Sequence, residues 1–170
     1  MKANELFRLL SSDEIDSIVL SACTDDEIPE KLAGGVLTYQ GIAIGRFAKL
    51  TEVQRKTYVR RTLRDRRAAD LALFVLSAAL TKQHPKMIGA FLDEVGLPHK
   101  GPHLEFEGEI PEPDAEKVGK GVDALLAKYD ARAVALYLVA FTAQPDVSWK
   151  ALEERLTTDA RLGVEDRSAA

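Results

Sequence analysis

A row of basic side chains between positions 56 and 67 is the feature of this sequence best suited to binding an anion. The row consists of Lys56, Arg60, Arg61, Arg64 and Arg67. At about 100° per residue, four of them fall on one face of a helix, and Arg61 flanks that face. Guanidinium groups match the geometry of carboxylate and phosphate oxygens. This basic stripe therefore predicts contact with an anionic partner.

Two kinds of anionic group could meet the basic stripe. The first is protein, either an acidic partner or the chain's own acidic segment, which carries Glu105, Glu107, Glu109 and Glu112. The second is nucleic acid. An excess of 27 acidic over 23 basic residues and the lack of interleaved aromatic side chains disfavour nucleic acid. We expect the stripe to lie near the acidic segment or a protein partner, with nucleic acid as the alternative.

The histidines offer a weak candidate for a metal site. His99, His103 and Glu105 lie close together in sequence, and imidazole and carboxylate groups bind divalent ions. However, a spacing of four residues aligns two histidines only on a helix, and Gly101-Pro102 between them prevents a regular helical turn. We therefore expect no metal and no cofactor.

No motif in the sequence predicts catalysis. The single cysteine, Cys23, precedes an acidic run, and neighbouring carboxylates would raise its thiol pKa and make it a poor nucleophile. Common signatures such as Gly-x-Ser-x-Gly, Cys-x-x-Cys and His-Glu-x-x-His are absent from the sequence. An enzyme or small-molecule site between distant helices stays an alternative, because carboxylates can converge from separate parts of the chain.

Helix signals recur along the whole chain. Capping boxes are expected at Ser11, Thr24 and Thr51, and prolines at 29, 85 and 145 suit the first turn of a helix. The predicted helices are 3–10, 12–22, 28–40, 51–65, 68–82, 85–95, 114–128, 131–143 and 146–158. Between 34 and 50, a helix that ends at Gly41 is favoured over a hairpin.

The second half of the chain resembles the first. The sequence LALFVL at 71–76 recurs as VALYLV at 134–139, which is 63 residues later. This spacing predicts an all-α single domain of two tandem three-helix repeats, similar to a helical solenoid. Its parts are N-terminal helices at 1–50, repeats at 51–96 and 114–158, a loop at 97–113 and a tail at 159–170. Helices 68–82 and 131–143 should be central, with Leu73 and Leu136 buried.

The loop at 97–113 is predicted to be extended. It holds four of the chain's seven prolines, and apolar and acidic residues alternate along it. This alternation predicts that Leu104, Phe106 and Ile110 contact the helices while the glutamates face solvent.

Composition completes the functional expectations. The chain has 170 residues, with 46% hydrophobic and 29% charged, as in ordinary globular proteins. One cysteine, no secretory leader and no long apolar run predict a cytoplasmic protein without a membrane segment. We expect a helical interaction or scaffold protein that binds a protein partner or itself. The alternatives are a nucleic-acid-binding accessory protein that uses the basic stripe, and a small-molecule binder or enzyme.

Overall fold

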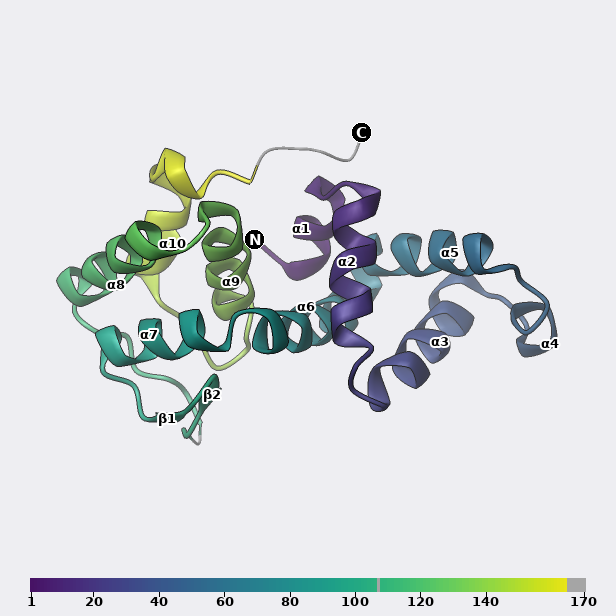
Figure 1. Ribbon diagram of the computed structural model, residues 1–170, viewed down its shortest axis with the longest axis horizontal. Helices are drawn as coiled ribbons and strands as arrows, with labels where there is room; N and C mark the ends of the chain where they lie inside the picture. The colour runs from purple at the N-terminus through teal and green to yellow at the C-terminus, as the bar shows by residue number, and fades with distance from the viewer. Residues whose placement is uncertain (107, 165–170) are drawn as a thin grey trace. The chain divides into compact units, whose positions relative to one another are not determined.

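The protein is all-α. The computed structural model describes residues 1–106 and 108–164. This part of the chain forms ten α-helices and one β-hairpin, whose two strands have two residues each (Figure 1). Its internal contacts divide it into two compact units. We call residues 2–79 the N-terminal unit, and residues 80–164 together with Met1 the C-terminal unit.

The N-terminal unit is built around helix α5. It contains α1 (Ala3–Leu9), α2 (Ser12–Ala22), α3 (Glu27–Gln40), α4 (Ile44–Phe47), α5 (Glu52–Arg64), the 3₁₀ turn η1 (Arg66–Ala68) and most of α6 (Ala69–Gln83). Helices α1, α2 and α3 all contact α5 (Figure 1). Fully buried side chains from four helices of this unit include Leu6, Phe7, Leu10, Ile15, Ile28, Val36 and Leu63, which join these helices into one core.

Short-range signals in the sequence decide where these helices begin and end. The Ser11 hydroxyl accepts the Glu14 N–H at 3.2 Å, and the Glu14 carboxylate accepts the Ser11 N–H at 2.8 Å. Thr51 and Gln54 form the same capping box at α5. Gly41 ends α3 in the left-handed conformation at φ 62°, which confirms the predicted helix. The capping box expected at Thr24 is wrong, because its hydroxyl donates to the Ser21 carbonyl at the end of α2 instead.

The C-terminal unit is built around α9. It contains the end of α6, α7 (Pro85–Val95), β1 (His99–Lys100), β2 (His103–Leu104), α8 (Ala115–Lys128), α9 (Ala131–Thr142), α10 (Lys150–Thr158) and the 3₁₀ turn η2 (Ala160–Leu162). Helix α8 packs on α7 and α10, and α9 packs on α8, α10 and η2. Eight residues of α9 are buried, which confirms that this helix is central.

Four aromatic side chains form the centre of this unit. Phe91 and Phe141 lie edge to face, with ring centroids 5.7 Å apart, and Trp149 lies 4.9 Å from Phe141. Tyr137 is the fourth member, with its centroid 5.6 Å from that of Phe91. Its hydroxyl is buried and has no hydrogen-bond partner among the described residues, and burial raises its pKa far above the ordinary value of a tyrosine.

The loop before α8 contains the hairpin of β1 and β2, and the predicted extended conformation is found at Ile110. The Ile110 N–H donates to the Asp146 carbonyl at 2.8 Å, and Ile110 forms a parallel bridge with Val147. This bridge holds Val147 in an extended conformation, so α10 begins at Lys150 and not at the expected position 146. Leu104 is half-buried, whereas the prediction for Phe106 is wrong because its side chain is 41% exposed. Glu107 lies outside the described residues.

Two leucines chosen from the repeated pattern are not core residues. Leu73 of α6 and Leu136 of α9 are only half-buried, while their neighbours Leu76 and Leu138 are completely buried. The predicted helices agree with the structure, so the error lies in which face of each helix meets the core. The repeat at a spacing of 63 residues is not confirmed and stays a prediction.

Candidate functional site

The centre of the basic stripe binds an acidic residue of its own unit. Arg60 on α5 donates from Nε and Nη2 to the two carboxylate oxygens of Asp16 on α2, at 2.8 and 2.6 Å. This two-point geometry is the strongest arrangement available to an arginine and a carboxylate. Arg60 therefore fastens α5 to α2.

Two further arginines of the stripe bind carbonyl groups. Arg64 donates to the carbonyl oxygens of Phe7 and Leu10, at 3.1 and 2.9 Å, and so satisfies the C-terminal end of α1. Arg67 donates to both carboxylate oxygens of Asp65 and to the Tyr39 carbonyl at the end of α3. Hydrogen bonds from the Arg67 side chain, followed by the one from its backbone, lower the Asp65 pKa to about 2.

The last two residues of the stripe have local contacts on α5 itself. Lys56 pairs with Glu52 one turn earlier at 2.9 Å, and the Arg61 guanidinium lies 6.0 Å from the centroid of the Tyr58 ring. The partners of the basic stripe found among the described residues are thus all in the N-terminal unit. The expected pairing of the stripe with the acidic segment is not found in the part of the chain that the structure describes. Glu112 of that segment instead accepts the Ala151 N–H at the start of α10. An anionic partner for the stripe stays a prediction.

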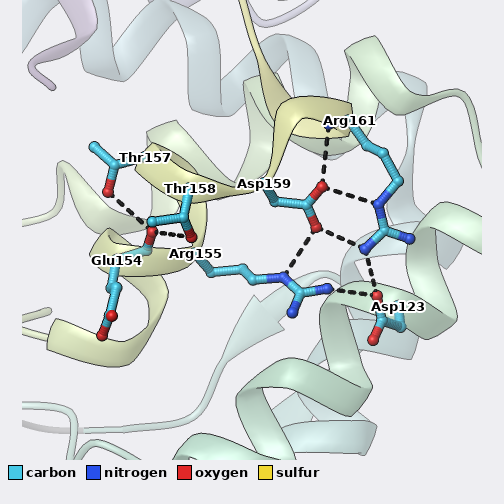
Figure 2. A network of polar contacts seen from close by, with 7 residues as sticks. All are labelled: Asp123, Glu154, Arg155, Thr157, Thr158, Asp159 and Arg161. Carbon is cyan, nitrogen blue, oxygen red and sulfur yellow. Dashed lines mark hydrogen bonds and ion pairs between the residues drawn. The ribbon is translucent and has the colours of Figure 1, made fainter.

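The C-terminal unit contains a comparable polar network (Figure 2). Arg155 and Arg161 both donate to one oxygen of Asp123, each at 2.7 Å. Arg161 also donates to both oxygens of Asp159, and Arg155 forms an ion pair with Asp159 at 3.0 Å. The network fastens α8 to α10 and η2. Hydrogen bonding from Arg161 keeps the Asp159 pKa far below its ordinary value, so this carboxylate stays ionised and does not exchange protons near neutral pH.

The two units therefore share two arrangements of arginine and aspartate. In each unit an aspartate directly follows a helix, which is Asp65 after α5 and Asp159 after α10. This aspartate accepts the backbone N–H of the arginine two residues later, Arg67 or Arg161, and also binds the guanidinium group of that arginine. In each, an arginine on the helix also reaches an aspartate on a neighbouring helix, α2 or α8. These arginines hold helices together, which gives them a role in the fold.

The predicted metal ligands form a structural contact instead. His99 Nδ1 lies 2.7 Å from the Gly101 carbonyl oxygen, and His99 Nε2 lies 3.0 Å from Asp93 Oδ1 on α7. Both ring nitrogens face acceptors, and only the protonated imidazolium can donate to both. His103 and Glu105 are exposed. Within residues 1–106 and 108–164, no three His, Cys, Asp or Glu side chains are grouped so that they could hold a metal ion.

The contact of His99 predicts a pH-dependent hairpin. The hydrogen bond to Asp93, followed by the one to the Gly101 carbonyl, raises the His99 pKa above the ordinary 6.5. The resulting stabilisation is fully present below pH 6.5 and is lost as the pH rises through the pKa of the folded state. We expect the protection of the amides in β1 and β2, measured as the exchange rate relative to the intrinsic rate at each pH, to fall over that interval.

An NMR titration of the His99 ring measures this pKa directly. We expect Asp93→Asn to lower the pKa towards 6.5, since the amide cannot replace the carboxylate charge. A wild-type His99 that titrates at or below 6.5 would contradict the contact.

A groove between α2 and α5 is the candidate site that remains after these structural contacts. Its volume is about 440 Å³. Half-buried Val19, Cys23 and Val59 form its apolar lining, and Glu52, Arg55 and Lys56 lie along its α5 side. Leu20 also lines the groove with its side chain 76% exposed, and Val53 on α5 is 74% exposed. The groove therefore combines apolar walls with exposed aliphatic side chains.

A larger cavity lies in the C-terminal unit. It has a volume of about 500 Å³, and apolar Met1, Leu156 and Val164 line it together with the charged Lys150, Glu153 and Glu154. Met1 is 61% exposed, so this cavity also has an exposed apolar side chain. The exposed lining of the α2–α5 groove is more apolar than that of this cavity. We therefore take the α2–α5 groove as the better candidate for binding an apolar group of another molecule.

Sequence reasoning missed this groove, although Leu20 carried a signal. Ile15, Ile18 and Ala22 are the buried residues of α2, and Leu20 lies on the opposite side of the helix. Single exposed apolar residues are ordinary on protein surfaces, so this signal does not by itself indicate an interaction surface. The thiol pKa of Cys23 is raised, as predicted, but the cause is burial and not the neighbouring carboxylates.

Comparisons of the chain with protein-family models, curated proteins and solved structures give no match. Within the described residues, no helix combines the length and apolar character that crossing a membrane requires. The α2–α5 groove is therefore the basis for the proposed function.

Proposed function

We propose that this protein is an interaction module that binds a protein partner through the groove between α2 and α5. The observation that carries the proposal is the exposure of Leu20 on an apolar groove. A single exposed leucine is ordinary on a protein surface, but Leu20 lines the same groove as the half-buried apolar side chains of Val19, Cys23 and Val59. Interaction sites commonly have an apolar centre and a charged rim, and this groove has both.

The size of the effect follows from burial. Covering a leucine side chain completely contributes about 1.5–3 kcal/mol, which corresponds to about a 10- to 100-fold change in affinity. Leu20 starts from 76% exposed, so a partner could gain most of this amount. The arginines of the basic stripe, in contrast, already donate to Asp16, to Asp65 and to carbonyl groups. Protein binding through the groove is therefore better supported than nucleic-acid binding through the stripe.

A site-specific photo-crosslinker tests the proposal in the full-length protein. Leu20 is replaced by p-benzoylphenylalanine, and Phe106, which is 41% exposed in the C-terminal unit, is replaced in the same way as the control. We expect Leu20 to give a discrete crosslinked protein that the control site does not give. A second crosslinker at Val53 should lose the same product when Leu20→Asp is added. Identical products from both sites, or none from Leu20, would overturn the proposal.

The single cysteine provides an independent readout. Cys23 lines the groove and is half-buried, so its reaction with a maleimide reports whether the groove is covered. We expect the purified partner to slow this reaction about 10-fold or more in the wild type, and to leave the rate unchanged in Leu20→Asp. Protection that survives Leu20→Asp would show that the partner binds elsewhere.

A further inference from the structure

We infer that the groove binds a second copy of this chain, so that α2 of each copy faces α5 of the other. The inference rests on the proposed function, because it names the partner of the same groove. Its starting point is the distribution of charge on the two walls, which the proposed function does not use.

The two walls of the groove have opposite charge. Residues 11–26, which contain α2 and the turn after it, hold five acidic and no basic residues. Residues 46–64, which contain α5 and the turn before it, hold seven basic residues and one acidic residue. Both segments belong to the N-terminal unit and contact each other directly. We call the first segment the acidic wall and the second the basic wall. Of their charged residues, Asp16, Glu52, Arg55 and Lys56 line the groove itself.

Part of this charge is neutralised within the unit, and part is displayed. Asp16 pairs with Arg60, and Glu52 pairs with Lys56. Asp25 and Asp26 at the end of the acidic wall are exposed, as are Arg46 and Lys49 at the start of the basic wall. These four exposed residues lie outside the lining of the groove, on the two segments that supply its walls. An incoming surface that covers both segments therefore meets negative charge on the first and positive charge on the second.

This pattern is complementary to itself. In a dimer with a twofold axis, each copy uses the same patch, and every contact occurs twice. When this twofold axis runs along the groove, between the two walls, the acidic wall of each copy faces the basic wall of the other. A partner with a uniform charge would instead be repelled by one of the two walls. Leu20 of each copy then enters the other copy's groove, beside Val19, Cys23 and Val59.

The expected dimer is reversible and sensitive to salt. One groove with its rim is smaller than the roughly 800 Å² per partner of a standard stable interface. Exposed charges are screened over about 10 Å at 0.1 M salt. We therefore expect concentration-dependent dimerisation at low salt, with the dissociation constant rising about 10-fold or more at high salt.

Charge reversal of each wall tests the arrangement by sedimentation velocity. The acid-reversed variant carries Asp25→Lys and Asp26→Lys, and the base-reversed variant carries Arg46→Glu and Lys49→Glu. Each variant alone should weaken self-association about 10-fold or more, because both copies of the contact become repulsive. An equimolar mixture should dimerise again, because the two altered walls attract each other and the two native walls still match. Leu20→Asp should stay monomeric in every mixture.

Dimerisation in the equimolar mixture distinguishes a lost contact from a folding defect, because two misfolded variants would not restore each other's dimerisation. Circular dichroism and thermal melts check each variant, because Asp25 also accepts the Glu27 N–H near the start of α3. A wild type that stays monomeric at low salt and high concentration would overturn the inference. So would variants that dimerise as the wild type does, or oligomers that grow beyond two copies.

The crosslinking experiment separates this inference from the proposed function. A Leu20 product of twice the chain mass supports both. A product with a different protein, from a chain that stays monomeric, supports the proposed function and overturns the second copy as the partner. The absence of both crosslinking and self-association overturns both.

Discussion

Replacing Trp149 by alanine is expected to destabilise the C-terminal unit by about 3–5 kcal/mol, which is the usual range for a buried large aromatic residue. Its side chain is 1% exposed and packs against Phe141 and Phe91. Its indole Nε1–H also donates to the Ile110 carbonyl at 3.1 Å. The substitution therefore opens a cavity and leaves a buried acceptor without its donor. This bond also fastens the extended loop to the start of α10, so both segments should loosen together.

Urea unfolding followed by circular dichroism measures the change, because Trp149 is the chain's only tryptophan and its fluorescence disappears in the variant. Hydrogen exchange then locates the loss in residues 80–164. Trp149→Phe keeps an aromatic ring but removes the hydrogen bond, so it should lose only about 1–3 kcal/mol. Tyr137→Phe removes a buried hydroxyl that has no partner within the described residues, so it should leave stability unchanged or higher. A loss below about 1 kcal/mol for Trp149→Ala would contradict the packing described here.

Replacing Leu76 by alanine is expected to destabilise the N-terminal unit by about 2–5 kcal/mol. Leu73→Ala is the matched control, because it makes the same chemical change three residues earlier on α6. Leu76 is completely buried and Leu73 is half-buried, so the control should lose about 1 kcal/mol or less. The change in helix propensity is the same at both sites and cancels in the comparison. Equal losses in urea unfolding would show that the core face of α6 has been assigned wrongly.

The positions of the helices could be predicted because their signals are local. The capping residues Ser11 and Thr51 lie within three residues of their partners, and Gly41 ends α3 through its own backbone conformation. The same reasoning failed where a distant contact intervened. Val147 is held extended by Ile110, 37 residues earlier in the chain, so the helix predicted from 146 begins at Lys150.

The partners of the charged residues could not be predicted. The spacing of the basic stripe showed that Arg60, Arg64 and Arg67 share a helix face, but it did not show which element would cover that face. The structure places α1, α2 and the end of α3 there, and these supply the Asp16 carboxylate and the carbonyl groups of Leu10 and Tyr39. A dense glutamate run elsewhere in the sequence was a plausible partner by charge alone, and charge does not specify distance.

The sequence by itself determined that this protein is all-α, where most of its helices lie and that its basic residues form a stripe. Each of these depends on residues within a few turns of one another. Only the tertiary structure decided that Arg60, Arg64 and Arg67 of the stripe fasten helices together. It also decided that Leu76 and not Leu73 enters the core, and that Leu20 lines a groove between α2 and α5. These properties depend on which helices meet and at what rotation, because the same side chain is buried, paired or exposed according to the element packed against it.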